Sequence, residues 1–160
     1  MLSMICLTPR TMMTDTEPAV VLVRTFRATC DKLYQAWTDP VMIQRWLAPG
    51  PNVVEQAETD LRVGGRFRLQ TRGPDGAEHR ISGCYRELEP ARRIVQTWIY
   101  DGPLDLLRGE ETLLQIEFTP RDNGTSDMRL THKRIARADI REAYREDWPS
   151  CFDKLAPLLH

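Results

Sequence analysis

The chain lacks the short motifs that mark several large enzyme classes. Its 160 residues contain no phosphate-binding P-loop, no Gly-x-Gly-x-x-Gly, no His-Glu-x-x-His and no Gly-x-Ser-x-Gly. Histidine is scarce, with only His79, His132 and His160. The first two fall on different predicted strands, so a metal site would need a third ligand from elsewhere. We therefore expect no metal, no cofactor and no catalytic residue that the sequence alone can name.

Neither sign of charge is in excess, since 22 Lys and Arg residues stand against 23 Asp and Glu residues. Proteins that bind nucleic acids usually carry a basic surplus, so we expect no nucleic-acid partner. Arg66, Arg68 and Arg72 do cluster, but they alternate with Phe67 and Leu69, which is typical of one solvated strand face. No apolar run approaches the roughly 18 residues of a membrane helix, so we expect no membrane span.

The four cysteines, at positions 6, 30, 84 and 151, lie too far apart in sequence for a zinc knuckle or a redox pair. The simplest interpretation is free thiols in a reducing cytoplasm, with Cys84 and Cys151 as small core residues. The first residues place Arg10 after an apolar stretch, which matches a secretory signal poorly. We expect residues 1–18 to be a disordered tail and residues 19–160 to form a single cytoplasmic domain.

What the chain does contain is a clear order of predicted elements. A strand at 19–27 precedes two short helices, with Thr29 as the N-cap of the first and Pro40 in the first turn of the second. Six strands follow, and turns such as the one at 73–76 join them as hairpins. We expect the helices at 30–37 and 41–47, and these strands at 53–59, 66–71, 79–88, 93–100, 111–119 and 126–134.

Apolar residues at spacings of three and four, such as Tyr144 and Trp148, predict a final helix over 138–159. Because hairpin-linked strands form an antiparallel sheet that needs a cover, we expect this helix to lie on the sheet in an α+β fold. Pro149 is the anomaly, since an internal proline costs a helix ~3 kcal/mol or more. We predict a kink at Pro149 or two helical pieces.

Several motifs occur in an order and spacing that resemble one superfamily. They are Ala36-Trp37-Thr38-Asp39-Pro40, Trp46, Gly64-Gly65-Arg66-Phe67, Gly83 with Tyr85, Glu110-Glu111-Thr112, and Trp148 followed by Phe152-Asp153-Lys154-Leu155. Over about residues 20–159 the chain resembles the helix-grip, START-like superfamily, also called SRPBCC. Within it, the chain is most similar to bacterial relatives of the C-terminal domain of the activator of heat-shock-protein-90 ATPase.

The resemblance implies a START-like, birch-pollen-allergen-like fold, in which a curved antiparallel sheet wraps on a long C-terminal helix. Two short helices would follow the first strand, and a hydrophobic cavity would lie between sheet and helix. Members of the superfamily bind lipids, sterols, polyketides or other apolar molecules, and some are enzymes. The family name itself links the chain to the stress response and to chaperones, although the eukaryotic activators carry a separate N-terminal domain for chaperone contact.

Three functional hypotheses remain open at this point. The leading one is a module that binds a small hydrophobic or amphipathic molecule in the cavity. The second is a co-chaperone-like interaction domain, an ATPase activator homologue, with a chaperone or a second copy of the chain as partner. The third is a small cavity enzyme such as a cyclase or hydrolase. It requires two polar groups to converge, for example His132 with Tyr100 or Asp105.

The candidate ligand-binding residues face the expected space between sheet and helix, where aromatic groups would give way to a few polar contacts. They are Trp46, Phe67, Leu69, Tyr85, Gln96, Trp98, Tyr100, Ile116, His132, Tyr144, Trp148 and Phe152. For His132 the alternatives are a cavity base or ligand contact and an ordinary hydrogen-bonded strand histidine. The loop at 101–109 carries three leucines, Leu104, Leu106 and Leu107, which would cover the cavity mouth or form a partner surface.

Overall fold

The computed structural model describes residues 18–159, so the predicted tail lies, except for its last residue, outside the described residues. In this range seven strands form one antiparallel sheet with the order β1-β7-β6-β5-β4-β3-β2. The strands are β1 (Ala19–Phe26), β2 (Val53–Thr59), β3 (Arg66–Arg72), β4 (Glu78–Glu89), β5 (Arg93–Asp101), β6 (Glu111–Pro120) and β7 (Ser126–Lys133). The helices are α2 (Cys30–Thr38), α3 (Pro40–Trp46) and α4 (Ala138–Leu155), with short 3-10 turns η1 (Asp105–Leu107), η2 (Asp122–Gly124) and η3 (Ala156–Leu158).

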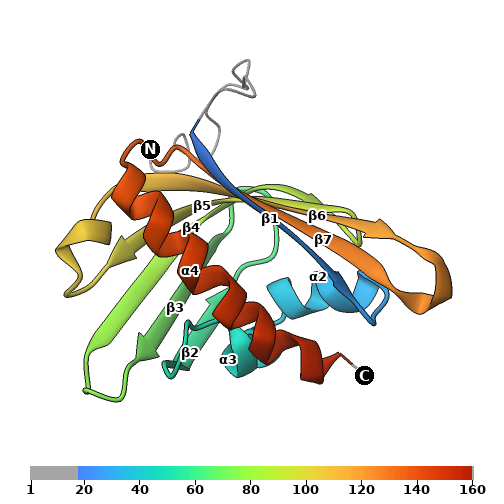
Figure 1. Cartoon of the computed structure of the whole chain (residues 1–160), viewed down its shortest axis with the longest axis horizontal. Coiled ribbons are helices and arrows are strands. Elements are labelled where there is room, and N and C mark those ends of the chain that lie inside the picture. The colour runs from blue at the N-terminus through green and yellow to red at the C-terminus, as the bar shows by residue number, and fades with distance from the viewer. Residues whose placement is uncertain (1–17, 160) are drawn as a thin grey trace.

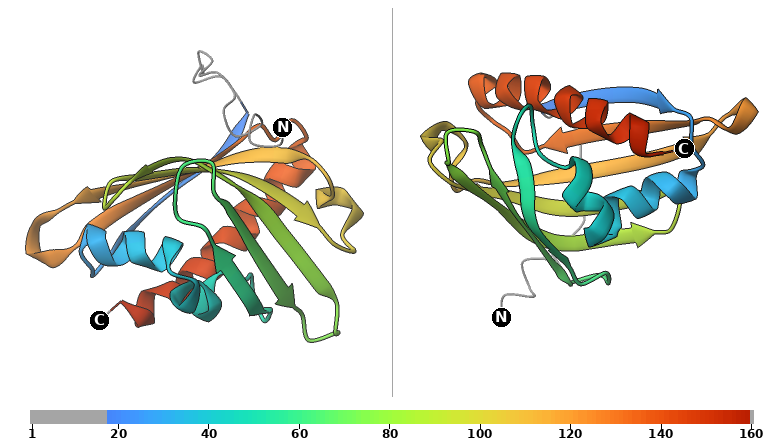
Figure 2. Two further views of the ribbon diagram at one scale, coloured as in Figure 1. Left: turned by 180° about the vertical axis from the view of Figure 1, so that it is seen from behind. Right: turned by 90° about the horizontal axis from the view of Figure 1, so that it is seen from below.

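The sheet curves around α4, and α2 and α3 lie on the same side of the sheet as α4 (Figures 1 and 2). All the predicted strands and helices are present, with boundaries within a few residues of those expected. The predicted helix-grip fold is therefore confirmed: a curved antiparallel sheet, a C-terminal helix and two short helices after the first strand.

The two short helices follow from local capping. Thr29 accepts a hydrogen bond from the backbone N–H of Lys32 and so begins α2. Asp39 closes α2 through its own N–H and begins α3 by accepting from the N–H of Val41, with Pro40 in the first turn. One residue thus sets both the end of one helix and the start of the next, which fixes the bend between them.

The long helix α4 is continuous through Pro149, so the alternative of two separate helical pieces is wrong. Its buried stripe packs against the sheet, and this burial offsets the backbone hydrogen bond that the proline removes. The stripe comprises Ile140, Tyr144, Trp148, Cys151, Phe152 and Leu155. The helix ends at Leu155 rather than at the predicted residue 159, because Pro157 lies in the next turn and η3 follows.

Cysteine chemistry departs from the sequence prediction at one position. Cys30 and Cys151 are free thiols, whereas Cys84 is not, so the expectation of free thiols is wrong at Cys84. Both Cys84 and Cys151 are buried, as the sequence predicted.

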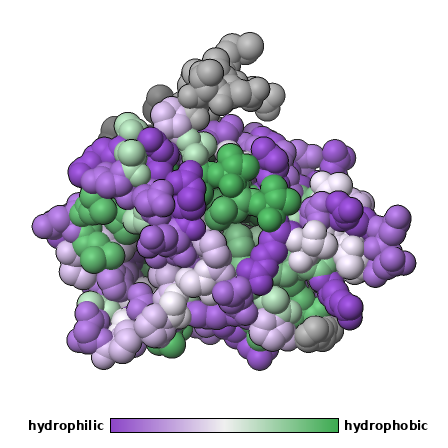
Figure 3. All heavy atoms as spheres, in the orientation of Figure 1, coloured by the Kyte–Doolittle hydropathy of each residue, from purple (hydrophilic) through white to green (hydrophobic). Residues whose placement is uncertain are grey.

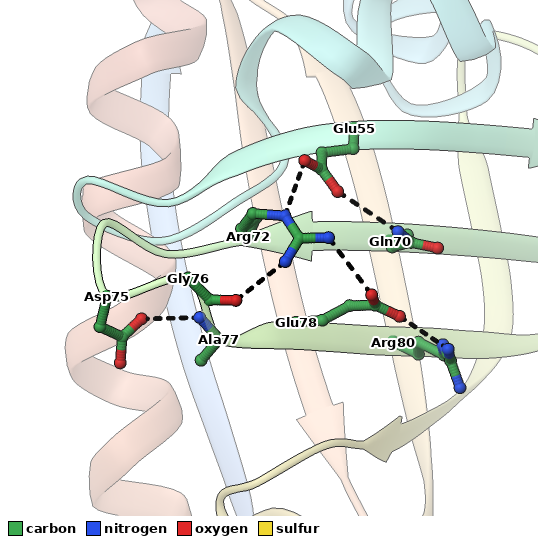
Figure 4. Close-up of polar contacts among 8 residues, drawn as sticks. All are labelled: Glu55, Gln70, Arg72, Asp75, Gly76, Ala77, Glu78 and Arg80. Carbon is green, nitrogen blue, oxygen red and sulfur yellow. Dashed lines mark hydrogen bonds and ion pairs between the residues drawn. The ribbon is translucent and has the colours of Figure 1, made fainter.

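The outer face of the sheet is polar and carries a network centred on Arg72 (Figure 4). Its guanidinium contacts Glu55 on β2 at 2.8 Å and Glu78 on β4 at 3.3 Å, and it donates to the carbonyl of Gly76 at 2.8 Å. Glu78 in turn pairs with Arg80 at 2.7 Å. The hydrogen bond from Arg72 lowers the pKa of Glu55 below its usual value. These contacts join three strands on the solvent side, where single ion pairs stabilise a fold only slightly.

Candidate functional site

Part of the space between sheet and α4 is filled by a buried hydrogen-bond network. His132 on β7 is fully enclosed. The indole N–H of Trp148 donates to His132 Nδ1 at 3.3 Å, so the ring proton must reside on Nε2. Nε2 then donates to the hydroxyl of Thr112 at 2.7 Å, and that hydroxyl donates to the carbonyl of Trp98 at 2.8 Å. The network crosses α4, β7, β6 and β5, and every polar group named here has a partner.

Burial lowers the pKa of His132 to about 3, so the imidazole is neutral at physiological pH. Its single free lone pair already accepts from Trp148, which leaves no nitrogen for a substrate proton. The structure brings His132 together with neither Tyr100 nor Asp105: the tyrosine bonds to His79, and the aspartate pairs with Arg108 at 2.7 Å. The geometry favours the alternative of a structural strand histidine.

Beside this network, the same space holds a cavity of about 70 Å³, and Trp98 and Trp148 belong to both. Its walls come from the loop after α3, from β3, β4 and β5, from η1 with the residue before it, and from α4. The lining residues are Leu47, Pro49, Asn52, Thr71, His79, Ile81, Trp98, Tyr100, Leu104, Leu107, Tyr144, Asp147, Trp148 and Cys151. Most of these side chains are aliphatic or aromatic, with a small number of polar groups among them, which is the usual composition of a small-molecule site.

The loop that contains η1 is fastened over the cavity by Tyr100. The Tyr100 hydroxyl accepts from the backbone N–H of Leu104 at 3.2 Å and lies 2.6 Å from Nδ1 of His79. A Cβ atom on Gly102 would meet this hydroxyl at 2.4 Å, so the tyrosine requires glycine there. Leu104 and Leu107 line the cavity, and the loop therefore contributes a wall to it.

Two polar groups of the cavity have no protein partner among residues 18–159. The indole N–H of Trp98 is buried and meets no acceptor with hydrogen-bond geometry, although the Tyr144 hydroxyl lies close enough to have its pKa lowered slightly by it. Burial outweighs that effect and raises the pKa of Tyr144 overall. The half-buried carboxylate of Asp147 makes no hydrogen bond or ion pair, and burial, followed by the charge of Glu146, raises its pKa.

A model of one protein family matches residues 27–160: Activator of Hsp90 ATPase homolog 1-like protein. The chain belongs to this AHSA1-like family. The AHSA1-like family lies within the START-like superfamily, so the resemblance inferred from the sequence motifs is confirmed. A search of curated proteins gave no significant match.

Solved structures share the fold of this AHSA1-like chain. Protein CV1439 from Chromobacterium violaceum is 27% identical with a TM-score of 0.79, and the match covers 88% of this chain and 96% of that one. NE0264 from Nitrosomonas europaea is 23% identical with a TM-score of 0.75, covering 91% and 96%. PFC0360w from Plasmodium falciparum, described as an Hsp90 activator, is 22% identical with a TM-score of 0.67, covering 88% and 95%.

Four of the twelve residues predicted for ligand binding line the cavity, namely Trp98, Tyr100, Tyr144 and Trp148. The other eight are buried elsewhere between sheet and helices: Trp46, Phe67, Leu69, Tyr85, Gln96, Ile116, His132 and Phe152. Trp46, for example, donates to the carbonyl of Ala36 and packs its ring on Trp37. Gln96 occupies the inward position next to Trp98 on β5, and its Oε1 is buried without a described partner.

Sequence reasoning missed Asp147, His79 and Cys151 as cavity residues. The sequence did contain a signal for Asp147. Tyr144, Asp147, Trp148 and Cys151 stand at i, i+3, i+4 and i+7, so the aspartate lies on the apolar stripe of α4. A single acidic residue on such a stripe marks a place where the helix does not simply pack on the sheet. For His79 the strand alternation gave no comparable signal.

Two further features limit the chemistry of the described range. In residues 18–159 no group of three or more His, Cys, Asp or Glu side chains is arranged to hold a metal ion. Over the same range no helix has both the length and the apolar character needed to cross a membrane.

Proposed function

We propose that this AHSA1-like chain binds a small hydrophobic or amphipathic molecule in the cavity between β3–β5 and α4. The observation that carries the proposal is the indole N–H of Trp98, a residue that lines the cavity: this N–H is buried and makes no hydrogen bond of good geometry among the described residues. Leaving a buried donor unsatisfied costs about 1–3 kcal/mol, and an oxygen of a bound molecule would remove that cost. The surrounding aromatic walls support the same assignment.

The volume bounds what can be enclosed. An engineered cavity of about 150 Å³ holds benzene, so the space of about 70 Å³ here accepts a slim apolar segment such as an alkyl chain rather than a bulky ring system. Apolar area removed from water contributes about 25 cal/mol per Å², less the costs of immobilisation. The rest of the ligand would extend past Leu104 towards solvent, since this side chain is 49% exposed.

Native followed by denaturing mass spectrometry of the purified protein tests the proposal. We expect an excess mass that is released on denaturation and identifies the ligand. Cys151→Met fills the cavity and should abolish the excess mass, whereas Cys30→Met, which adds the same side chain away from it, should not. A bare mass that stays bare after incubation with fatty acids, aliphatic alcohols and aliphatic amines would contradict the proposal.

A second candidate function is activation of the ATPase of an Hsp90 chaperone. The family name and the description of PFC0360w support it. Exposed apolar side chains offer contact surface: Leu104 and Leu106 near η1, and Val21 and Val23 on β1. On the face of the molecule seen in Figure 1, Figure 3 shows hydrophobic (green) areas over the middle of the molecule and at the left, with hydrophilic (purple) residues between them.

The measurement for this candidate is the ATPase rate of a purified Hsp90 with and without the chain. Stimulation that is lost in Leu104→Ser with Leu106→Ser, and kept in Val53→Ser on β2, would support it. An unchanged rate at a large excess of the chain would rule it out for that chaperone.

A further inference from the structure

The cavity contains one carboxylate, and its position is set by the helix. Asp147 follows Tyr144 by three residues and precedes Cys151 by four, so all three lie on the face of α4 that turns towards the sheet. Its neighbours on that wall are aromatic or apolar. A carboxylate in such surroundings loses hydration without gaining a partner, which is unfavourable unless something else supplies the opposite charge.

No described cation supplies that charge. Lys154, two turns further along α4, donates to the backbone carbonyls of Ala48 and Asn52, at 2.9 Å for the latter, and is held on the loop after α3. The charge that acts most on Asp147 is that of Glu146, which has the same sign. Among the residues that line the cavity, His79 is the only Lys, Arg or His, and its Nδ1 lies 2.6 Å from the Tyr100 hydroxyl.

The walls next to the carboxylate suit a cation for a second reason. The rings of Trp98 and Trp148 pack in a tilted arrangement with 5.2 Å between their centroids, and Tyr144 on α4 also lines the cavity. The faces of aromatic rings carry partial negative charge and attract ammonium groups within about 6 Å. An anionic head group, by contrast, would face both these rings and an unpaired carboxylate.

We propose that the cavity selects an apolar molecule bearing a positively charged amino group, with the ammonium at Asp147 and the apolar chain along Trp98 and Trp148. This inference rests on the proposed ligand-binding function and adds the charge of the ligand to it. A free aliphatic amine and a larger molecule that ends in one offer the same chemistry, and simple probes are enough to test the charge.

Three probes of equal chain length separate charge from apolar burial: hexylamine, 1-hexanol and hexanoate. Each is titrated into the protein at pH 7 and 150 mM salt while the indole N–H signals are followed by NMR. The chain has four tryptophans. Trp98 and Trp148 report on the cavity, and Trp37 and Trp46, whose N–H groups bond to Met128 and to the Ala36 carbonyl, serve as internal controls.

We expect hexylamine to bind at least about tenfold more tightly than hexanoate, a difference of about 1.4 kcal/mol, and to shift the signals of Trp98 and Trp148 alone. Asp147→Asn should lower the affinity for hexylamine by a similar factor and leave the affinity for 1-hexanol unchanged. Glu146→Gln is the matched control, because it removes one negative charge from the neighbouring residue, which does not line the cavity.

The outcomes distinguish the two proposals. If 1-hexanol shifts the Trp98 signal but the amine has no advantage, the cavity binds ligands and the charge inference is overturned. An equal loss of hexylamine affinity in Asp147→Asn and Glu146→Gln also overturns it, because a general negative field would then explain the preference. If none of the three probes shifts either cavity signal, the binding function fails together with the inference.

Discussion

The buried hydrogen-bond network and the cavity beside it use the same residue types in opposite ways. In the network, the N–H of Trp148 donates to His132, and the chain of hydrogen bonds continues through Thr112 to a backbone carbonyl. At the cavity, the N–H of Trp98 meets no described acceptor and the carboxylate of Asp147 has no described partner. Aromatic rings surround both the network and the cavity, so hydrophobicity alone does not tell them apart.

This difference in hydrogen bonding indicates which of the two places would gain stability from a bound molecule. A satisfied buried network orders its surroundings and gains nothing from a ligand, whereas a buried group without a partner is stabilised by one. His132, the strongest sequence candidate for a base or a ligand contact, therefore stabilises the fold instead. The less conspicuous Asp147 and Trp98 define the place where a ligand would lower the free energy.

The largest expected effect comes from breaking the buried hydrogen-bond network. His132→Ala leaves the indole N–H of Trp148 without its acceptor and creates a void, so we expect a loss of about 3–4 kcal/mol in the free energy of unfolding. Urea denaturation measures it. Thr112→Val, which removes only the last hydroxyl of the network, should cost about half as much. A loss below about 1 kcal/mol for His132→Ala would contradict the structural role.

Acid should have the next largest effect, because it destabilises the same buried network. The pKa of His132 is about 3 in the folded protein and about 6.5 in an unfolded chain, so between these values the unfolded state binds the extra proton. The free energy of unfolding therefore falls as the pH drops through this window, by about 1.4 kcal/mol per unit from this group. Denaturation between pH 7 and 5 measures the slope. His132→Gln should flatten it, and equal slopes in both proteins would refute the assignment.

Tyr100→Phe tests how the η1 loop is held at the cavity. The variant loses the hydrogen bonds to His79 and to the Leu104 N–H. We therefore expect the free energy of unfolding to fall by about 1 kcal/mol and amide exchange in the loop to become faster. Hydrogen exchange measured by mass spectrometry resolves this segment. Tyr34→Phe is the control, because its hydroxyl makes no hydrogen bond among the described residues and its loss should leave exchange in residues 102–109 unchanged.

The smallest effect has the opposite sign. Because burial raises the pKa of Asp147, the folded state prefers the protonated carboxyl, and stability is lost as the pH rises through the folded pKa. Asp147→Asn should therefore raise the free energy of unfolding at pH 7 by less than about 1 kcal/mol, or the melting temperature by about 2 °C. The gain should shrink at pH 4. A destabilised variant at pH 7 would show that the carboxylate has a partner in the free protein.

Most of the fold could be predicted because its signals are local. Strand alternation places Leu114, Ile116 and Phe118 inward, and the Thr29 cap sets the start of α2. For α4, the alternative of two helical pieces was wrong because local and tertiary effects compete there. An isolated helix would break at Pro149, but packing of the stripe on the sheet holds it continuous, and the second proline, Pro157, ends the regular helix instead.

The site could be predicted only in part, because alternation identifies the face on which a residue lies but not its position along the groove. Phe67 on β3 and Trp98 on β5 both point inward from the two strands that flank β4, yet only Trp98 lines the cavity. Which polar atoms lack partners is a property of the packed structure. The sequence shows that Trp98 carries an N–H group, but not that its acceptor is missing.

The position of α4 along the chain also bears on how the protein is made. Synthesis proceeds from the N-terminus, so all seven described strands leave the ribosome before the helix that covers them, and α4 packs on β1 across more than a hundred residues. Until residues 138–155 emerge, the concave face of the sheet stays uncovered and open to aggregation. The last helix therefore completes the fold only after the whole sheet has been synthesised.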